Sequence, residues 1–179
     1  MSEPQEFPVP GRLLPVCCAT VVTPEIIDNL ITISETDSME SFFVIMDKIT
    51  GIYNDQTKVG DWTQPTSEDS PFIDKSPMAC YLLLRQLISD TDSDINHEHF
   101  AIFDERTLRD GSIVLVDGPW GKGEDEGVAR TVRVAPEIAQ ERLLLYNIGE
   151  PEIDEDQAIA QEAVDGVLRV EALMNRPPT

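Results

Sequence analysis

The sequence predicts an α+β fold: a single domain in which about five helices surround a mixed, mainly antiparallel sheet. Its 179 residues are enough to enclose one hydrophobic core. Short apolar runs bounded by turn residues, at 100–103 and 113–116, are typical of strands. They are joined by a connection that is too short for a helical crossover. This spacing favours α+β over a doubly wound parallel sheet.

The ends of the chain are predicted to lie outside the packed domain. Residues 1–12 contain three prolines and few side chains to bury, which indicates a flexible arm. We therefore place the single domain at residues 13–174 and a short tail at 175–179.

The domain begins with a predicted strand and a helix. Residues 13–22 are β-like, and we expect one of Cys17 and Cys18 to face the core and the other to face outward. Thr23 followed by Pro24 is typical of a helix start, because proline suits the first helical position.

The next apolar stretch, residues 39–49, is ambiguous. Its propensity suits a strand, but its large apolar side chains recur at helical spacing. Asp37 and Glu40 form a capping-box pair, and Gly51 stands just past the end. We predict a helix here, followed by a polar, turn-rich segment at 52–75.

Further helices are predicted from Ser76-Pro77, from Pro136 and from Asp154, which is expected to act as an N-cap. Residues 167–170 are predicted to form a closing strand. The continuous apolar runs imply strands covered on both faces, so we expect three side chains to be fully buried. These are Ile102, Val114 and Val116.

Charge is the most unusual property of the composition. Thirteen basic residues against 34 acidic ones give a net charge of −21. This balance argues against binding to nucleic acid or to an anionic membrane surface. The acidity can simply maintain solubility, or it can complement a basic protein surface, even as a nucleic-acid mimic.

The rest of the composition favours a cytoplasmic protein. Three cysteines, two of them adjacent, do not suggest a disulfide scaffold. The acidic, proline-rich start is unlike a signal or transit peptide, and no apolar run approaches membrane-spanning length.

The C-terminal half resembles a small uncharacterised domain family of actinobacteria and fungi, known as a domain of unknown function. The segments that carry the resemblance share their order along the chain and lie at 100–108, 114–117, 130–136, 147–148 and 163–169. The motifs are mostly structural, so the resemblance implies an order of elements but no catalytic residues. Residues 52–75 and the loop around Trp120 depart from the family pattern.

Polar residues at the ends of the predicted central strands are candidate binding residues: Asp104 and Arg106 after the first strand, and Asp117 after the second. If the two strands are antiparallel, the carboxylates of Asp104 and Asp117 lie on the order of 15 Å apart. That distance is too large for a paired-carboxylate catalytic site of the glycosidase type, so solvated strand ends or turn capping are expected for both.

The loop at 118–123 supplies two further candidate binding residues, Trp120 and Lys122. Its glycines suggest a phosphate loop, but the acidic residues 124–126 follow the lysine where a helix would be required. We therefore predict a hairpin loop. Trp120 would either anchor a partner or fold back over the core as a lid.

His97 and His99 are the only histidines, and two imidazoles on one face of an extended segment could share a metal ion. We instead expect surface histidines, no metal and no cofactor. A Cys–His nucleophile has no support in the sequence.

The sequence therefore predicts a small acidic interaction or regulatory module without catalytic activity. Its partner would be a protein with a basic surface, or a second copy of the chain. The alternative is a small metal-independent enzyme, of isomerase or cyclase type, that uses carboxylates in an apolar pocket.

Overall fold

The computed structural model describes residues 10–119 and 127–176. Five strands form one sheet: β1 (Leu14–Cys18), β2 (Phe43–Met46), β3 (His99–Phe103), β4 (Ile113–Asp117) and β5 (Arg130–Val134). Six helices are described: α1 (Pro24–Ser34), α2 (Pro77–Asp90), α3 (Glu105–Asp110), α4 (Pro136–Ile148), α5 (Ile153–Glu162) and α6 (Val170–Met174).

The sheet is mixed, with the strand order β2-β1-β3-β4-β5. Strands β2, β1 and β3 are parallel, whereas β3, β4 and β5 are antiparallel, and the antiparallel register covers more residue pairs. The predicted α+β class is confirmed. The parallel part arises because α1 connects β1 to β2 and α2 connects β2 to β3, which are crossovers long enough to reverse the chain.

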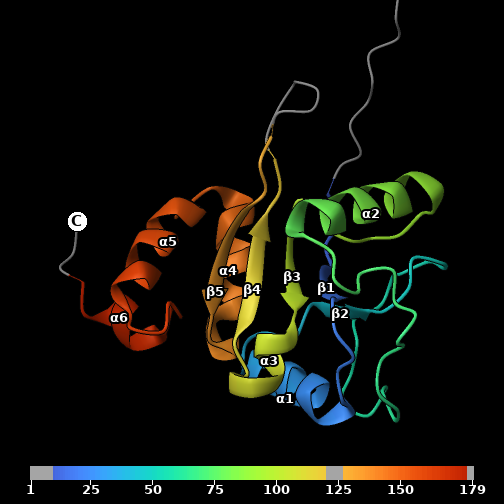
Figure 1. Cartoon of the computed structure of the whole chain (residues 1–179), viewed down its shortest axis with the longest axis horizontal. Helices are drawn as coiled ribbons and strands as arrows, with labels where there is room; N and C mark the ends of the chain where they lie inside the picture. The colour runs from blue at the N-terminus through green and yellow to red at the C-terminus, as the bar shows by residue number, and fades with distance from the viewer. Residues whose placement is uncertain (1–9, 120–126, 177–179) are drawn as a thin grey trace, which may run out of the picture.

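Helices cover the two faces of the sheet unequally (Figure 1). One core cluster joins one face of all five strands to α1, α4 and α5. A second cluster joins the opposite face of β1, β2 and β3 to α2 and also includes Val116 of β4. That second face is therefore well covered over the parallel strands and less covered over β4 and β5.

This unequal cover explains the exposure of the central strands. Ile102 and Val116 are buried, as predicted. Val114 is only partly buried, so the prediction of full burial was wrong for this residue. Its side chain lies on the face of β4 that α2 covers less completely.

Both adjacent cysteines are buried, which corrects the prediction that one of them faces outward. Cys18 belongs to the cluster beneath α1 and α4, and Cys17 belongs to the cluster beneath α2. Alternation does point the two side chains to opposite faces, but β1 is an inner strand with a packed layer on each side.

The predicted helix at residues 39–49 was also wrong, since residues 43–46 form β2. All four residues of β2 are buried, and the strand pairs in parallel register with β1. A short apolar run satisfies helical and strand patterns equally well, and here the pairing with β1 selects the strand.

The connection between β3 and β4 is more elaborate than a simple hairpin turn. The two strands pair antiparallel, as expected, but the short helix α3 lies between them. Gly111 ends that helix in the left-handed conformation, with φ of 74°, which glycine adopts without strain.

Two predicted features of the C-terminal region were wrong. Helix α5 begins at Ile153 with Glu152 as its N-cap, so Asp154 lies in the first turn. The expected closing strand is reduced to a single bridge between Leu168 and Val134, after which α6 begins.

The proline-started helices are confirmed at Pro24, Pro77 and Pro136. At the N-terminal boundary, Gly11 and Arg12 hydrogen-bond to residues 94–95. Residues 1–9 of the predicted arm and 177–179 of the predicted tail lie outside the described residues. None of the helices in the described part of the chain combines the length and apolarity needed to cross a bilayer.

Candidate functional site

The chain connections diverge at the carboxyl ends of β1 and β3. From β1 the chain passes through α1 to β2, whereas from β3 it passes through α3 to β4 on the other side. In open sheets with parallel strands, ligands bind in the crevice that opens where neighbouring connections diverge. This end of the sheet is therefore where the topology favours a binding site.

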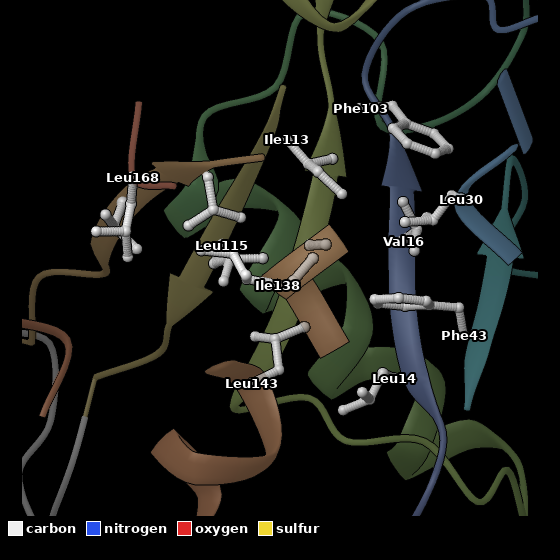
Figure 2. Close-up of a cluster of buried hydrophobic side chains, with 14 of the residues drawn as sticks. Leu14, Val16, Leu30, Phe43, Phe103, Ile113, Leu115, Ile138, Leu143 and Leu168 are labelled. Atoms are coloured by element: carbon white, nitrogen blue, oxygen red, sulfur yellow. The ribbon is translucent and has the colours of Figure 1, made fainter. Parts of the chain in front are cut away.

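A cavity of about 230 Å³ lies at this position, and we call it the switch-point cavity. Its interior is apolar, because the side chains of Leu30, Phe103 and Ile113 are buried in the core cluster drawn in Figure 2. The residues that line it come from α1, the end of β3, the α3–β4 turn and the start of α4. They are Glu25, Ile26, Asn29, Leu30, Phe103, Gly111, Ile113 and Pro136.

The mouth of the cavity carries one carboxylate. Glu25 and Asn29 are exposed on the first turns of α1. Hydrogen bonds from the Glu25 backbone N–H and from the Thr23 hydroxyl lower the pKa of the Glu25 carboxyl. Glu25 is therefore an anion at neutral pH, suited to contact a cation and unsuited to donate a proton.

Asp104 is the N-cap of α3 and links that helix to β5. Its Oδ1 accepts the Thr107 N–H at 3.1 Å, and the Thr107 hydroxyl accepts the Asp104 N–H at 3.1 Å, which completes a capping box. The Arg133 guanidinium donates to both carboxylate oxygens of Asp104. Burial works to raise the pKa of Asp104, but the hydrogen bond and charge of Arg133 lower it on balance.

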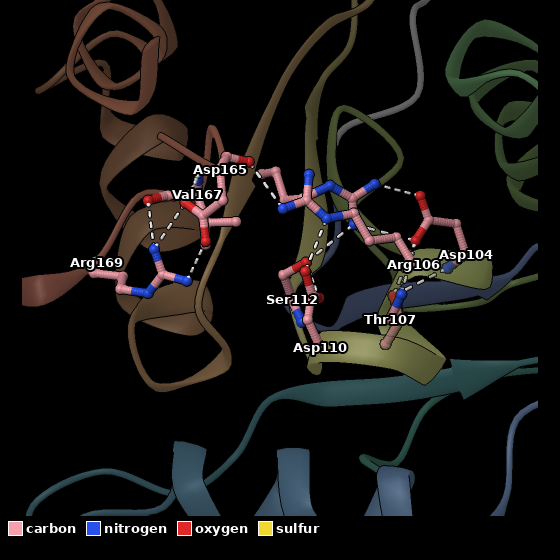
Figure 3. A network of polar contacts seen from close by, with 9 residues as sticks. Asp104, Arg106, Thr107, Asp110, Ser112, Asp165, Val167 and Arg169 are labelled. Carbon is pink, nitrogen blue, oxygen red and sulfur yellow. Dashed lines mark hydrogen bonds and ion pairs between the residues drawn. The ribbon is translucent and has the colours of Figure 1, made fainter. Parts of the chain in front are cut away.

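The turn after α3 is fixed by a second group of contacts, shown in Figure 3. Asp110 accepts the backbone N–H of Ser112 at 2.9 Å, and Arg106 Nε donates to Asp110 at 2.8 Å. Arg106 Nη2 also donates to the Asp165 carbonyl at 2.8 Å. These bonds hold the turn that contains Gly111, so the network positions one side of the switch-point cavity.

Asp117 belongs to the opposite end of the sheet. It pairs in register with His99 and Arg130 of the neighbouring strands. His99 Nε2 lies 2.9 Å from Asp117 Oδ1, and Arg130 forms an ion pair with Asp117 Oδ2. Arg130 Nη1 also lies 2.9 Å from a carboxylate oxygen of Asp154 on α5. We call these four residues the His99–Asp117 cluster.

The structure therefore separates the predicted binding residues. It brings Asp104 and Arg106 together at the switch-point end, and it places Asp117 at the far end of the antiparallel pair. This agrees with the expectation that Asp104 and Asp117 do not form a shared site. Asp104 caps α3, as expected, but the expectation of a solvated strand end or turn cap was wrong for Asp117, which is 3% exposed because β3 and β5 flank it. Trp120 and Lys122 lie outside the described residues, although the antiparallel pairing of β4 and β5 fits the predicted hairpin.

The histidines are buried, which corrects the expectation of surface histidines. His97 is 3% exposed and His99 is 1% exposed. The Asn96 side chain accepts the backbone N–H groups of Glu98 and His99, which forms a tight turn just before β3. The His97 ring lies beside the Tyr81 ring in a tilted arrangement, with 6.0 Å between the centroids. Burial, together with the charges of neighbouring groups, lowers the pKa of His97 to about 4.

Three residues of this site were not identified from the sequence. Arg133, the partner of Asp104, could have been found, because alternation along β5 places it on the face opposite Val132 and Val134. No sequence pattern indicates Glu25 and Asn29, since they line the cavity only because α1 approaches the α3–β4 turn.

Among the residues that the structure describes, no three histidine, cysteine or acidic side chains lie close enough to hold a metal ion. Comparisons with protein-family models, with curated proteins and with solved structures find no match. The resemblance over the C-terminal half therefore stays a prediction, and function is argued from the geometry.

Proposed function

We propose that this protein is a non-catalytic interaction or regulatory module of the cytoplasm that binds a protein partner with a basic surface. The observation that carries the proposal is the way in which the positive charges are used. Most arginines are occupied by contacts within the chain, so the large acidic surplus is left for the surface.

Six of the nine arginines form an ion pair with an aspartate of the same chain. The most buried pair joins α4 to α5, where Arg142 donates two hydrogen bonds of 2.7 Å to Asp156. Tyr146 donates a third to the same carboxylate. Arginines held in this way cannot screen the remaining carboxylates, which favours association with a basic surface.

Exposed carboxylates gather around the start of α5. Glu150, Glu152, Asp154 and Glu155 are all exposed within six residues. Their position at a helix N-terminus is favourable, because the helix dipole stabilises negative charge there. The fold therefore tolerates this concentration of charge without a partner. Asp154 is paired with Arg130, so the carboxylates of Glu150, Glu152 and Glu155 are the ones that remain available for one.

Self-association by strand addition is disfavoured at both edges of the sheet. At β2, Thr57 hydrogen-bonds to both Phe43 and Ile45 along the outer edge. At β5, the Leu168 N–H and the Gln157 side chain each donate to an outer carbonyl. Blocked edges and mutual charge repulsion both favour a different protein as the partner.

A small metal-independent enzyme of isomerase or cyclase type is the second candidate. One observation favours it: the switch-point cavity combines an apolar interior with the carboxylate of Glu25. The lowered pKa of Glu25 suits a weak base and not an acid, so this candidate ranks second. Turnover of a small apolar substrate that is abolished by Glu25→Gln would overturn the binding proposal.

The proposal is tested by the salt dependence of a native complex. The affinity of this protein for a partner isolated from the native cell should fall at least about tenfold between low and high salt. Exposed charges are screened over about 8 Å at physiological ionic strength. The triple variant Glu150→Gln, Glu152→Gln, Glu155→Gln should bind less tightly and show a shallower salt dependence. An affinity that does not change with salt would contradict the proposal.

A further inference from the structure

We propose that the switch-point cavity receives one bulky apolar side chain from a basic segment of the partner, while Glu25 pairs with a lysine or arginine next to that side chain. This inference rests on the proposed function and deepens it, because it names the contact through which a basic partner would be recognised.

The size of the cavity limits the occupant. At about 230 Å³ it is smaller than a typical site for a drug-sized ligand, roughly 300–1,000 Å³. It is nevertheless larger than an engineered cavity of about 150 Å³ that holds benzene. A cavity of this volume suits a single leucine, methionine or phenylalanine side chain.

The lining favours an apolar group in the interior. Leu30 and Phe103 are each 1% exposed and Ile113 is fully buried, so these side chains form the floor of the cavity. Ile26 and Pro136 are only partly buried, and an inserted apolar side chain would remove their remaining surface, together with its own, from water. The α3–β4 turn is held by the Asp110 contacts, so the cavity is preformed.

The charge at the mouth favours a cation beside that apolar group. Glu25 is the one charged residue among the described lining residues. A carboxylate accepts several hydrogen bonds, so Glu25 retains acceptor capacity beyond its bonds with its own backbone N–H and with the Thr23 hydroxyl. Helix N-termini alone would favour an anion, but the first turns of α1 and α4 already carry Glu25 and Glu137. A lysine or arginine is therefore the better match.

The position in the fold is independent support. The cavity lies where the connections from β1 and β3 diverge, which is the place where a sheet of this topology leaves a crevice. Its location thus follows from the strand order, and its chemistry follows from the lining residues.

The test uses three synthetic peptides with the full chain. The first has a leucine between two pairs of lysines, the second replaces that leucine by glycine, and the third keeps the leucine but replaces lysine by glutamate. Binding is followed by amide chemical shifts in NMR spectra. The leucine–lysine peptide should shift the amides of Asn29, Gly111 and Ile113 and bind about tenfold more tightly than the glycine peptide. The glutamate peptide should not bind.

Two variants test the residues, each with a matched control on or next to the same helix. Asn29→Trp should fill the mouth of the cavity and remove the preference for the leucine peptide over the glycine peptide. Thr32→Trp changes an exposed position outside the lining and should leave that preference unchanged. Glu25→Gln should lower the affinity for the leucine–lysine peptide by about threefold or more. Glu35→Gln should lower it less. Both cavity variants change exposed residues, and circular dichroism checks their fold.

The outcomes separate this inference from the proposed function. Equal binding of the leucine and glycine peptides, with shifts only at exposed acidic segments, would overturn the cavity inference and leave the proposed function standing. Failure of both lysine peptides to bind would also overturn the inference. The proposed function is then decided by the salt dependence of the native complex.

Discussion

The two ends of the antiparallel strand pair use charged residues in different ways. At the switch-point end, the Asp104 side chain is 32% exposed and its partner Arg133 is 17% exposed. In the His99–Asp117 cluster, the side chains of His99 and Asp117 are 1% and 4% exposed. The outer members of that cluster, Arg130 and Asp154, are 35% and 56% exposed, so the enclosed part is the His99–Asp117 contact. The Asp104–Arg133 pair instead stabilises an accessible turn beside a cavity.

This difference indicates which charges serve folding and which remain available for contacts. A buried ion pair is costly to break, because the remaining partner keeps its charge without compensation. A half-exposed pair is screened by water and contributes little to stability. We therefore expect substitutions at the two ends to differ mainly in their effect on stability, and the following predictions test that comparison.

The largest effect is expected in the buried contact between α4 and α5. Asp156→Ala should lower the free energy of unfolding by about 3–5 kcal/mol, because it leaves the Arg142 guanidinium buried without its carboxylate. Asp165→Ala, which removes the exposed pair with Arg169, is the control and should be much less destabilising, because water screens that pair. Urea denaturation measures both. Similar losses in the two variants would show that burial does not determine the cost.

The two ends of the sheet can be compared directly with Asp117→Ala and Asp104→Ala. Asp117→Ala should cost about 3 kcal/mol, since both His99 and Arg130 lose a buried partner. Asp104→Ala should cost about 1–2 kcal/mol, mainly through the lost N-cap of α3. The comparison fails if Asp104→Ala proves the more destabilising in urea denaturation.

The buried histidine beside Tyr81 should make stability depend on pH. The pKa of His97 is about 4 in the folded protein and about 6.5 in an unfolded chain. The unfolded state therefore binds more protons between these values, so stability is full above pH 6.5 and falls as the pH drops toward 4. The loss by pH 5 should be on the order of 1–2 kcal/mol.

The substitution His97→Phe tests this pH dependence. It should flatten the change in unfolding free energy between pH 7 and pH 5, while the aromatic contact with Tyr81 is retained. An unaltered pH dependence in the variant would assign the effect to carboxylates elsewhere in the chain.

The smallest difference between two variants is expected from the unequal cover of the sheet. Val116→Ala should cost about 2 kcal/mol, since Val116 is fully buried. Val114→Ala should cost about 1 kcal/mol or less, because Val114 lies where α2 covers the sheet less completely. Thermal unfolding of the two variants measures both losses of stability. A greater loss of stability for Val114→Ala than for Val116→Ala would contradict the unequal cover of this face of the sheet.

Most local elements could be predicted, but the candidate site could not. Pro24, Pro77 and Pro136 begin helices as predicted, because proline at the first helical position acts through the backbone of its own turn. The cavity depends on Glu25 and Gly111, which are 86 positions apart and meet only because α1 packs near the end of β3.

The errors have a common cause in long-range packing. Residues 43–46 form a strand because they pair with β1, although their spacing suits a helix. His97 and His99 are buried because the turn at Asn96 precedes a strand that is covered on both faces. Each of these outcomes depends on a neighbour that local periodicity does not identify.

The sequence by itself determined the charge balance, the α+β class, the strands β3 and β4 and the proline-started helices, because these follow from composition, short-range backbone preferences and local periodicity. The tertiary structure decided which arginine meets which aspartate, which face of β4 is covered and where a cavity remains. These properties depend on contacts between segments that are distant in the chain. Such contacts contribute to stability only after the sheet and its helices have packed together.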